Sequence, residues 1–279
     1  MKKTFLSVLA FAIAGVVTVS VLSACSDDDN DNGNENKKNS FVILKNGAVE
    51  PSQQVDMGVF NIDGKNYRLI FAKTNLTARG LAKMESDFGD YFAWASQEPW
   101  CTGYERTAIS LTPTAWKSGK ADGYTLDNAQ YYEDGRYTKY QNENEQLAAE
   151  DDVAHNVLGG DWRIPSSAVW KALLDANNTQ VTWGKDGQLG MSFIDETGKP
   201  GMKITSIANP DNYIFLPATG RIIEKEFLYV GVQGCYLSST LATPYNIWGL
   251  GFGEGSGGVF TTCRRMTGCA IRPVRLVAE

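Results

Sequence analysis

From residue 41 onward, short strand patterns are many and helix patterns are few. Tyr67–Ala72 is a strong strand pattern, and it follows Asp63-Gly64, a favoured two-residue turn. We therefore predict a hairpin that begins near Val55 and ends at Ala72. Further strands are predicted at Val181–Trp183, Gly190–Ile194 and Tyr213–Pro217, and short β-like runs with glycine turns extend from Cys235 to Val277.

Two segments have a helical pattern. Pro165-Ser166-Ser167 has the pattern of a helix start. Asp152–Leu158 is expected to form one short helix capped by its aspartate. Few helices and many short strands indicate an α+β domain built around small antiparallel sheets, with one or two helices and long loops. The apolar residues that recur at helical spacing after Ser167 are Val169, Trp170, Leu173 and Leu174.

Aromatic residues gather in Glu85–Trp94, which should therefore belong to the core. Cys101–Ala149 is polar and tyrosine-rich and is predicted to be a long excursion of loops. No internal repeat and no second core pattern is found. We therefore predict one folded domain over residues 41–279.

The first residues have the pattern of an export signal. Lys2 and Lys3 precede an apolar run, Phe5–Leu22, so residues 1–24 are predicted to be a signal peptide. The run ends in Leu22-Ser23-Ala24-Cys25, which resembles the lipobox of bacterial lipoproteins, and this resemblance implies lipidation of Cys25 and attachment to the outer membrane. The alternative is an uncleaved transmembrane helix.

Residues 25–40 contain almost no apolar side chain. The stretch is acidic and amide-rich, cannot bury a core, and is predicted to be a disordered tether. Ser26 followed by three aspartates resembles the surface-export signal of Bacteroidota lipoproteins, which implies a protein facing the cell exterior. The alternative is a solvated linker on a lipoprotein that faces the periplasm.

Charge excludes some functions. The 279 residues carry a net charge of −6, and removal of Lys2 and Lys3 with the signal peptide would make it −8. Nucleic-acid binding needs clustered Lys and Arg, so we expect no nucleic-acid partner. His155 is the one histidine, which excludes a histidine-rich metal site.

Four cysteines remain if Cys25 is lipidated. Two disulfides are possible in an exported chain, with three connectivities among which the sequence does not choose. A local bridge between Cys263 and Cys269 is plausible, and buried free thiols are the alternative. Since no close cysteine pair has a matching second pair, we predict no zinc site and no other metal site. The four cysteines are Cys101, Cys235, Cys263 and Cys269.

Five segments along the chain match, in order, the motifs of one known family: Asp87–Trp94, Gly159–Pro165 with Trp170 and Leu173, Phe215–Gly220, Tyr236–Thr240 and Cys269–Arg275. They resemble the Fibrobacter-type major paralogous domain proteins, which include surface lipoproteins and targets of diversity-generating retroelements. The resemblance spans about residues 55–275 and implies the C-type-lectin-like fold, in the branch shared with formylglycine-generating enzyme. That fold carries many activities, so the resemblance does not by itself fix the function.

Several positions depart from the family pattern. Leu237 replaces a usual tryptophan, and Val169 stands where glutamate is frequent. The calcium signatures of C-type lectins are absent, so calcium-dependent sugar binding of that type is not expected. Cys263 and Cys269 differ in spacing from the copper-binding cysteines of formylglycine-generating enzyme, so that activity is not carried over, and no cofactor is predicted.

Catalytic candidates are few. Asp151, Asp152 and Asp161 could pair as an acid and a base, but helix capping and turn formation explain them better. A Ser-His-Asp arrangement would have to use His155, and no Gly-x-Ser-x-Gly segment supplies a serine. We predict no catalytic residue.

Two other motifs have structural explanations. Gly253, Gly255 and Gly258 match the spacing of a dinucleotide-binding motif, but no helix follows, so a tight loop between strands is expected. Trp162, Arg163 and Trp170 could form a sugar platform. Their family counterparts lie in the core, with the arginine bound to backbone carbonyls, and the resemblance implies the same here.

The segment Leu241–Met266 lies between two motifs of the resemblance. In retroelement targets the matching segment forms the exposed ligand-binding face, and Tyr, Trp and Arg supply most interface energy. Alternate residues, such as Trp248, Leu250 and Phe252, could instead point inward as strand core. The predicted ligand-binding residues are Pro244, Tyr245, Asn246, Trp248, Arg264 and Arg265, of which Tyr245, Asn246 and the two arginines are most expected to be exposed.

The sequence thus predicts a non-catalytic surface lipoprotein that recognises an extracellular glycan or protein through its C-terminal loop face. One alternative is an enzyme of the formylglycine-generating type or a glycan-processing accessory. Another is a subunit of a surface or pilus-tip assembly.

Overall fold

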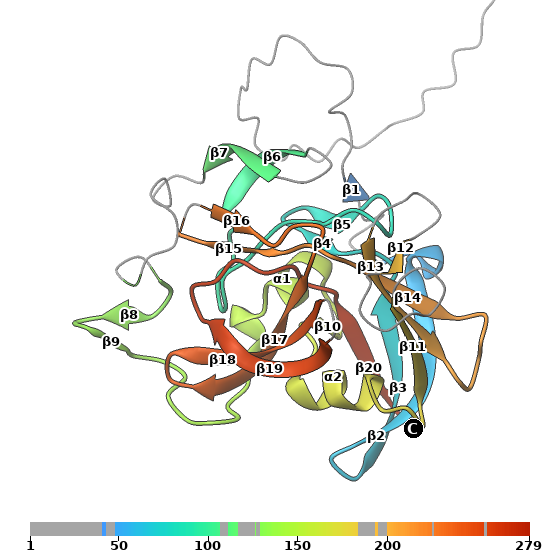
Figure 1. Cartoon of the computed structure of the whole chain (residues 1–279). Coiled ribbons are helices and arrows are strands. Elements are labelled where there is room, and N and C mark those ends of the chain that lie inside the picture. The colour runs from blue at the N-terminus through green and yellow to red at the C-terminus, as the bar shows by residue number, and fades with distance from the viewer. Residues whose placement is uncertain are drawn as a thin grey trace, which may run out of the picture. The chain divides into compact units, whose positions relative to one another are not determined.

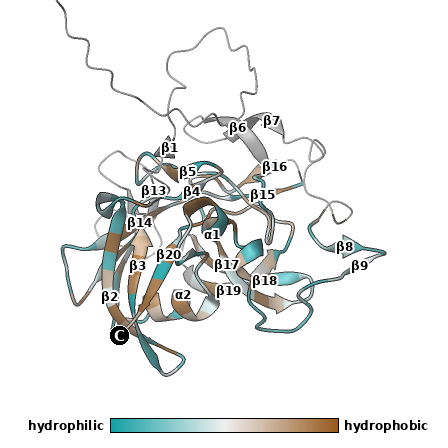
Figure 2. Cartoon of the chain, turned by 180° about the vertical axis from the view of Figure 1, so that it is seen from behind, coloured by the Kyte–Doolittle hydropathy of each residue, from teal (hydrophilic) through white to brown (hydrophobic). Residues whose placement is uncertain are grey.

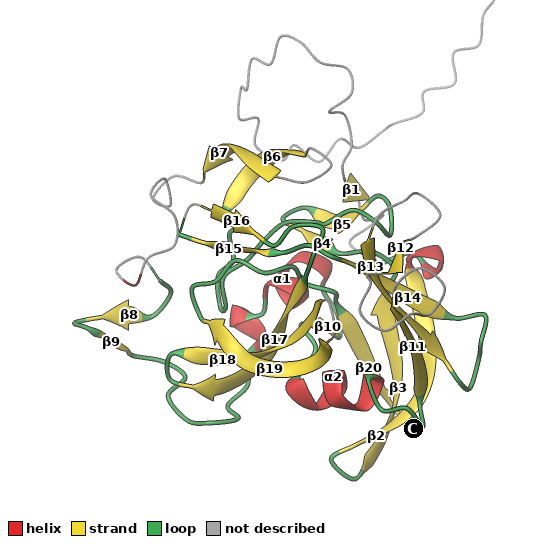
Figure 3. Cartoon of the chain, in the orientation of Figure 1, coloured by secondary structure: helices red, strands yellow, loops and turns green. Residues whose placement is uncertain are grey.

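The structure is a computed structural model, and it describes residues 41–42, 48–106, 111–116, 126, 129–183, 193–194, 200–224, 226–253 and 256–279. These residues belong to one compact unit, Asn39–Glu279. The predicted signal peptide, Cys25 and tether lie outside the described residues. The described part consists mostly of small antiparallel sheets, with two α-helices and many loops, so the predicted α+β class is confirmed (Figures 1 and 3).

Three sheets form the main frame, and the strands within each are antiparallel. The order of the first is β10-β20-β3-β2, the second places β13 between β11 and both β12 and β14, and the order of the third is β17-β18-β19. Their bounds are β2 Gln54–Ile62, β3 Lys65–Ala72, β10 Trp162–Arg163, β11 Thr179–Trp183, β12 Phe193–Ile194, β13 Pro200–Ser206, β14 Tyr213–Pro217, β17 Gly234–Thr243, β18 Asn246–Gly253, β19 Ser256–Arg264 and β20 Val274–Ala278.

Smaller sheets, two α-helices and the 3-10 helices Pro51–Gln53 and Ala149–Asp151 complete the described elements. α1 (Val153–Leu158) is capped by Asp152, whose carboxylate accepts bonds from the N–H groups of Ala154 and His155. α2 (Ser167–Leu173) is capped by Ser166, so both predicted helix starts are confirmed. The smaller sheets are β1 Phe41–Val42, β5 Gly80–Ala82 and β4 Leu76–Thr77; β6 Cys101–Arg106 and β7 Leu111–Trp116; β8 Tyr132–Glu133 and β9 Arg136–Tyr137; and β15 Arg221–Ile223 and β16 Glu226–Leu228.

The predicted hairpin is β2–β3. Asp63 and Gly64 have φ angles of 51° and 80°, as a two-residue turn with two left-handed residues requires. In Figure 2 hydrophobic and hydrophilic stretches alternate along β2, and its inward residues Met57, Phe60 and Ile62 are buried. A register shift between Asp56 and Gly58 lets Met57 and Phe60 share the inward face although they are three residues apart, and the period-two pattern holds from Phe60 to Ile62.

The expectation that Cys101–Ala149 holds only loops is wrong, because the described part of it contains the hairpins β6–β7 and β8–β9. The second hairpin turns at Asp134 and Gly135, whose φ angles are 50° and 79°. This is the same Asp-Gly signal that predicted the β2–β3 turn. Few flanking apolar residues concealed it in the sequence.

β17 runs through the centre of the domain, and nine of its ten residues are buried. Trp94 and Trp170 donate their indole N–H groups to the carbonyl oxygens of Leu237 and Ser238: Trp170 to Leu237 at 3.1 Å and Trp94 to Ser238 at 2.9 Å. Both indoles are fully buried, as the aromatic cluster and the helix pattern predicted. Each tryptophan thus packs apolar area and satisfies a carbonyl of the central strand.

The most constrained polar side chain is Arg272, which has no exposed surface. Its Nε donates to Asn75 Oδ1 at 2.8 Å, its Nη1 to the carbonyls of Ala72 and Lys73 at 3.3 and 2.6 Å, and its Nη2 to the Phe215 carbonyl at 2.8 Å. Burial lowers the pKa of Arg272 to about 10, so it stays charged at neutral pH. One cation thereby joins the end of β3, the segment that follows it, and β14.

No helix among the described residues is long and apolar enough to cross a membrane. The apolar run Phe5–Leu22 lies outside those residues, so the structure does not test the export signal.

Arg272→Met should lower the free energy of unfolding by at least about 3 kcal/mol, because three buried carbonyls and the Asn75 amide oxygen would lose their donors. Urea unfolding followed by tryptophan fluorescence measures this change. Arg272→Lys, which keeps a cation and some donors, should recover part of the loss. A loss below about 1 kcal/mol in the methionine variant would contradict this role of Arg272.

Candidate ligand-binding site

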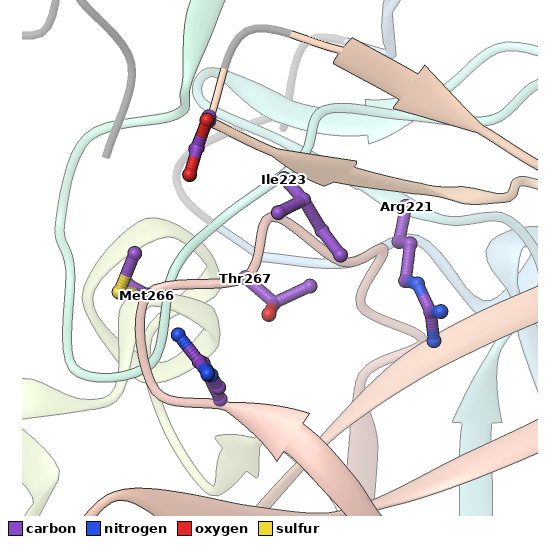
Figure 4. A pocket seen from close by; sticks show the side chains of 6 residues that line it. Arg221, Ile223, Met266 and Thr267 are labelled. Atoms are coloured by element: carbon purple, nitrogen blue, oxygen red, sulfur yellow. The ribbon is translucent and has the colours of Figure 1, made fainter. Parts of the chain in front are cut away.

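Two neighbouring hollows of about 370 and 340 Å³ share Arg264 and Met266 in their walls. Arg264 is the last residue of β19, and Met266 lies in the loop that follows. In Figure 4, Ile223 and Arg221 of β15 and Met266 and Thr267 of the loop after β19 lie around the first hollow. The first hollow is lined by Arg221, Ile223, Glu224, Arg264, Met266 and Thr267, and the second by Leu126, Tyr137, Tyr245, Asn246, Arg264 and Met266.

Tyr245 lies in the turn between β17 and β18, and Asn246 is the first residue of β18. The Tyr245 ring is 48% exposed and stands edge-on to the buried Tyr137 ring, with centroids 5.6 Å apart. Asn246 pairs with Arg264 in the β18–β19 register, so these two side chains start from adjacent backbone positions. Asn246 is held further by its backbone and side-chain N–H groups, which donate to Thr243 Oγ1.

Arg264 and Arg265 are neighbours in sequence with opposite surroundings. Arg264 is exposed, whereas Arg265 is 2% exposed, so the prediction that Arg265 is an exposed ligand-binding residue is wrong. The guanidinium of Arg265 lies 3.8 Å from the ring centre of Tyr137 and 4.8 Å from that of Trp94. Arg264 ends β19 with its side chain opposite the buried Cys263, as strand alternation requires, and Arg265 lies in the turn that follows.

Arg265 fastens three loop carbonyls. Its Nη1 donates to the carbonyl oxygens of Lys139, Tyr140 and Pro244, at 3.1, 3.1 and 3.3 Å. Its backbone N–H also donates to the Tyr245 carbonyl at 3.1 Å. Burial lowers the pKa of Arg265 to about 10, which leaves it positively charged at neutral pH. Arg265 is therefore a positioning residue for Tyr245 and for the wall that holds Tyr137.

The remaining predicted residues divide differently. Pro244 is exposed in the β17–β18 turn but does not line either hollow. Trp248 is half-buried and lies under Lys171 Nζ at 5.0 Å, away from both linings. Leu250 and Phe252 are buried, as the inward-facing alternative for this segment expected. Of the six predicted residues, the structure thus brings together Tyr245, Asn246 and Arg264.

The sequence reasoning missed the contribution of β15. Arg221 and Ile223 lie more than forty residues before Arg264 and reach the same hollow. The position of β15 depends on Gly220, whose φ is +64° and where a Cβ atom would lie 2.3 Å from the Leu228 carbonyl oxygen. Only glycine fits that approach. The Phe215–Gly220 motif was recognised, but no signal in the sequence tied the residues after it to this face.

A buried charge supports the wall beside the second hollow. Asp151 accepts bonds from Lys139 Nζ at 2.6 Å, from the Tyr140 hydroxyl at 2.5 Å and from the Tyr131 hydroxyl. Burial acts to raise the pKa of Asp151, but the bonds from Lys139, Tyr131 and Tyr140 outweigh it, and the pKa lies below its usual value. The cluster holds Lys139 and Tyr140, whose carbonyls Arg265 binds.

The other candidates have structural roles. The Asp152 carboxylate caps α1 and also accepts a bond from the Ile164 N–H at 2.8 Å, which confirms the capping explanation. Asp161 is exposed. Trp162 and Trp170 are buried, but Arg163 is exposed, so the expectation of a core arginine is wrong, although its Nε does donate to the Asp161 carbonyl.

Gly253 and Gly258 lie in the paired strands β18 and β19, so the glycine-rich segment joins two strands as expected; Gly255 is outside the described residues.

Three of the cysteines lie together as buried free thiols. Cys235, Cys263 and Cys269 are the described residues whose side chains could jointly hold a metal ion. The predicted local bridge between Cys263 and Cys269 is not formed, and the free-thiol alternative holds for them. Spacing along the chain excluded a zinc site, but spacing carries no signal that Cys235 lies beside the other two cysteines in the fold. The Cys101 side chain lies outside the described part.

Comparison of the chain with protein-family models, curated proteins and solved structures finds no match.

The adjacent arginines should respond differently to the same substitution. Arg265→Met should lower the free energy of unfolding by about 2–4 kcal/mol, because three carbonyls lose a charged donor inside the fold. Arg264→Met should change it by less than about 0.5 kcal/mol, since that side chain is exposed. Urea unfolding of both variants checks this difference, and equal losses would contradict the assigned orientations.

Asp151→Asn should destabilise the protein by roughly 1–3 kcal/mol at neutral pH, because it weakens the bonds from Lys139 and the two tyrosines. The folded-state pKa of Asp151 is depressed, so its contribution is present above its unfolded pKa and is lost as pH falls through the folded value. The difference in stability between wild type and variant should therefore be constant at higher pH and begin to narrow as the pH falls below about 4. Urea unfolding between pH 7 and pH 3 measures the difference, and a gap that does not change with pH would contradict this assignment.

Proposed function

We propose that this chain is a non-catalytic, lipid-anchored surface protein that binds an extracellular glycan or protein through the two hollows around Arg264. The observation that carries the proposal is that Arg264 and Met266 line both hollows and that the half-exposed Tyr245 lines the second. Attachment to the outer membrane through Cys25 and exposure to the exterior rest on the sequence of residues 1–40. The C-type-lectin-like fold is likewise part of the proposal.

The chemistry of the hollows suits recognition. Tyr245 offers a ring face, Asn246 an amide, and Arg264 a guanidinium that can donate two parallel bonds. Arg221 adds a second guanidinium to the first hollow, and its buried Nε has no hydrogen-bond partner among the described residues. A ligand with oxygen acceptors would satisfy these donors. Each hollow also falls within the volume range of small-ligand sites, roughly 300–1,000 Å³.

The site is mounted on strands and on buried bonds. Arg264 ends β19, Arg221 begins β15, and Tyr245 is tied through its carbonyl to the Arg265 backbone. Such mounting reduces the ordering that binding would otherwise require. It supports a preformed recognition face.

The lining residues favour binding over hydrolysis. Glu224 is the one carboxylate among the residues that line the two hollows, and glycoside hydrolysis ordinarily needs a pair. His155 and Asp152 belong to α1 and its cap and line neither hollow. We therefore assign no catalytic residue to this face.

The five motifs that carry the family resemblance occupy structurally central positions. Trp94, Trp170, Leu237 and Arg272 come from four of them and are all buried. Leu237 fills the position of the family's usual tryptophan without becoming exposed, at 1%. These placements support the proposed C-type-lectin-like fold.

The full-length chain in detergent should bind specific members of a glycan array or a panel of extracellular proteins, and Tyr245→Ala/Arg264→Ala should reduce that binding at least tenfold. Because the calcium signatures are absent, EDTA should leave binding unchanged. Arg163→Ala, an exposed arginine outside both hollows, is the matched control and should bind as wild type. Circular dichroism confirms that the variants are folded.

Binding that survives in the double variant would refute the site but keep the recognition function. Failure to bind any member of both panels would count against the function itself, and it would favour the assembly-subunit alternative.

A further inference from the structure

Three cysteine side chains meet inside the core, and the recognition face does not use them. Cys235 is in β17, and Cys263 is the second-last residue of β19. Cys269 follows the loop after β19. Their exposed fractions are 3%, 2% and 0%. The Sγ atoms of Cys235 and Cys269 are 2.9 Å apart, those of Cys263 and Cys269 are 3.2 Å apart, and those of Cys235 and Cys263 are 3.6 Å apart.

Backbone pairing, and not chance proximity of loops, brings these sulfurs together. The N–H of Cys269 donates to the Phe92 carbonyl and the N–H of Phe92 to the Cys269 carbonyl, each at 3.0 Å. Ala270 donates its N–H to the Cys235 carbonyl at 3.1 Å and pairs with Tyr236 in a parallel bridge. Cys235 and Cys269 are therefore held side by side on neighbouring backbone segments.

The distances distinguish two uses of a thiol trio. A thiophilic ion with metal–sulfur bonds of about 2.3 Å would keep its sulfurs roughly 3.7–4.0 Å apart. Two of the three separations are well below that range, whereas a disulfide brings its sulfurs to about 2.05 Å. Cys269 takes part in both short separations. The geometry therefore favours a bond from Cys269 to one of its neighbours over a bound ion.

We propose that the trio is an oxidation site in which Cys235 and Cys269 form a disulfide while Cys263 remains a thiol able to exchange into it. In the oxidation the two S–H bonds break and one S–S bond forms. Two protons and two electrons pass to a small-molecule disulfide such as oxidised glutathione, which becomes two thiols.

In the exchange step the Cys263 thiolate attacks Cys269 Sγ and displaces Cys235 as a thiolate. One S–S bond breaks and one forms, with no net change in oxidation state. Bonds donated by the Cys235 and Cys269 thiols lower the pKa of Cys263, and the charge of Arg221 acts in the same direction. A thiolate is the nucleophile in such exchange, so this environment suits the attacking role of Cys263.

The exchange would change the loop that carries the recognition face. Cys263 and Cys269 bracket residues 264–268, which include Arg264 and Met266. A Cys235–Cys269 bond fastens only the far end of this loop to β17, whereas a Cys263–Cys269 bond would close the loop on itself. The oxidation site stands on its own contacts and does not depend on what the face binds.

The full-length chain, refolded in detergent with a glutathione redox buffer, tests the proposal through peptide mapping without reduction. We expect Cys235–Cys269 as the main cross-link in the core and Cys263 as a thiol that is alkylated on unfolding. Reduction should lower the melting temperature by roughly 5–15 °C. Cys101→Ser is the matched control and should leave the core cross-link unchanged.

Cys235→Ala tests the exchange and should move the bond to Cys263–Cys269, while Cys263→Ala should keep Cys235–Cys269. Should Cys235→Ala not fold, alkylation of the oxidised wild-type protein in urea without reductant replaces it: Cys235 and Cys263 should both be partly labelled if the bond exchanges, and only Cys263 if it does not. Three alkylated core thiols after oxidation, a main bond to Cys101, or a stoichiometric metal that protects all three thiols would each overturn the oxidation site. A folded Cys235→Ala with no Cys263–Cys269 bond would overturn the exchange.

Discussion

A single buried guanidinium, that of Arg272, sets the constraint from which the rest of the domain follows. None of its partners is a carboxylate; three backbone carbonyls and the Asn75 side chain share its donors. A cation in this position requires every donor to be satisfied, so the segments that supply the carbonyls must meet at fixed distances. Asn75 also donates to the Phe88 carbonyl and the Tyr236 hydroxyl, and Tyr236 in turn donates to the Pro217 carbonyl. Four stretches that are distant in sequence are thereby held around the central strand β17.

The proposed recognition face relies on a related buried cation closer to the surface, although the Nε and Nη2 atoms of Arg265 have no hydrogen-bond partner among the described residues. Arg265 is a second buried guanidinium that binds carbonyls, here those of Lys139, Tyr140 and Pro244, and two aromatic rings cover it. Arg264 ends β19 on the side opposite the buried Cys263, and Arg265 begins the turn that follows with its side chain in the core. Arg265 thus fastens the loop directly after the residue that lines both hollows. The position of the exposed Arg264 therefore depends in part on a buried residue that lines neither hollow.

Local patterns predicted local structure well. The Asp63-Gly64 turn, the Asp152 cap and the serine-capped helix at 167–173 all follow from short-range rules and are confirmed. The predictions that were wrong or missing concern contacts between distant segments. Arg265 was expected at the surface but is buried, and the proximity of Cys235 to the other two thiols was not predicted. Likewise Arg221 lines the first hollow with Arg264, although β15 and β19 belong to separate sheets. Burial of a charged side chain depends on partners from other segments of the chain, and neither residue type nor spacing along the sequence predicts those partners.

The central claim is that Arg265 is buried in the core while its neighbour Arg264 is exposed, and arginine-specific labelling of the folded chain with phenylglyoxal tests it most directly. Peptide mapping over time should show rapid modification of Arg264, while Arg265 and Arg272 react only when the chain is unfolded by urea. Arg163, which is exposed elsewhere, provides an internal standard for the rate at an open position. Equal modification of Arg264 and Arg265 in the folded protein would contradict the account of the face, and modification of Arg272 in the folded protein would contradict the account of the frame.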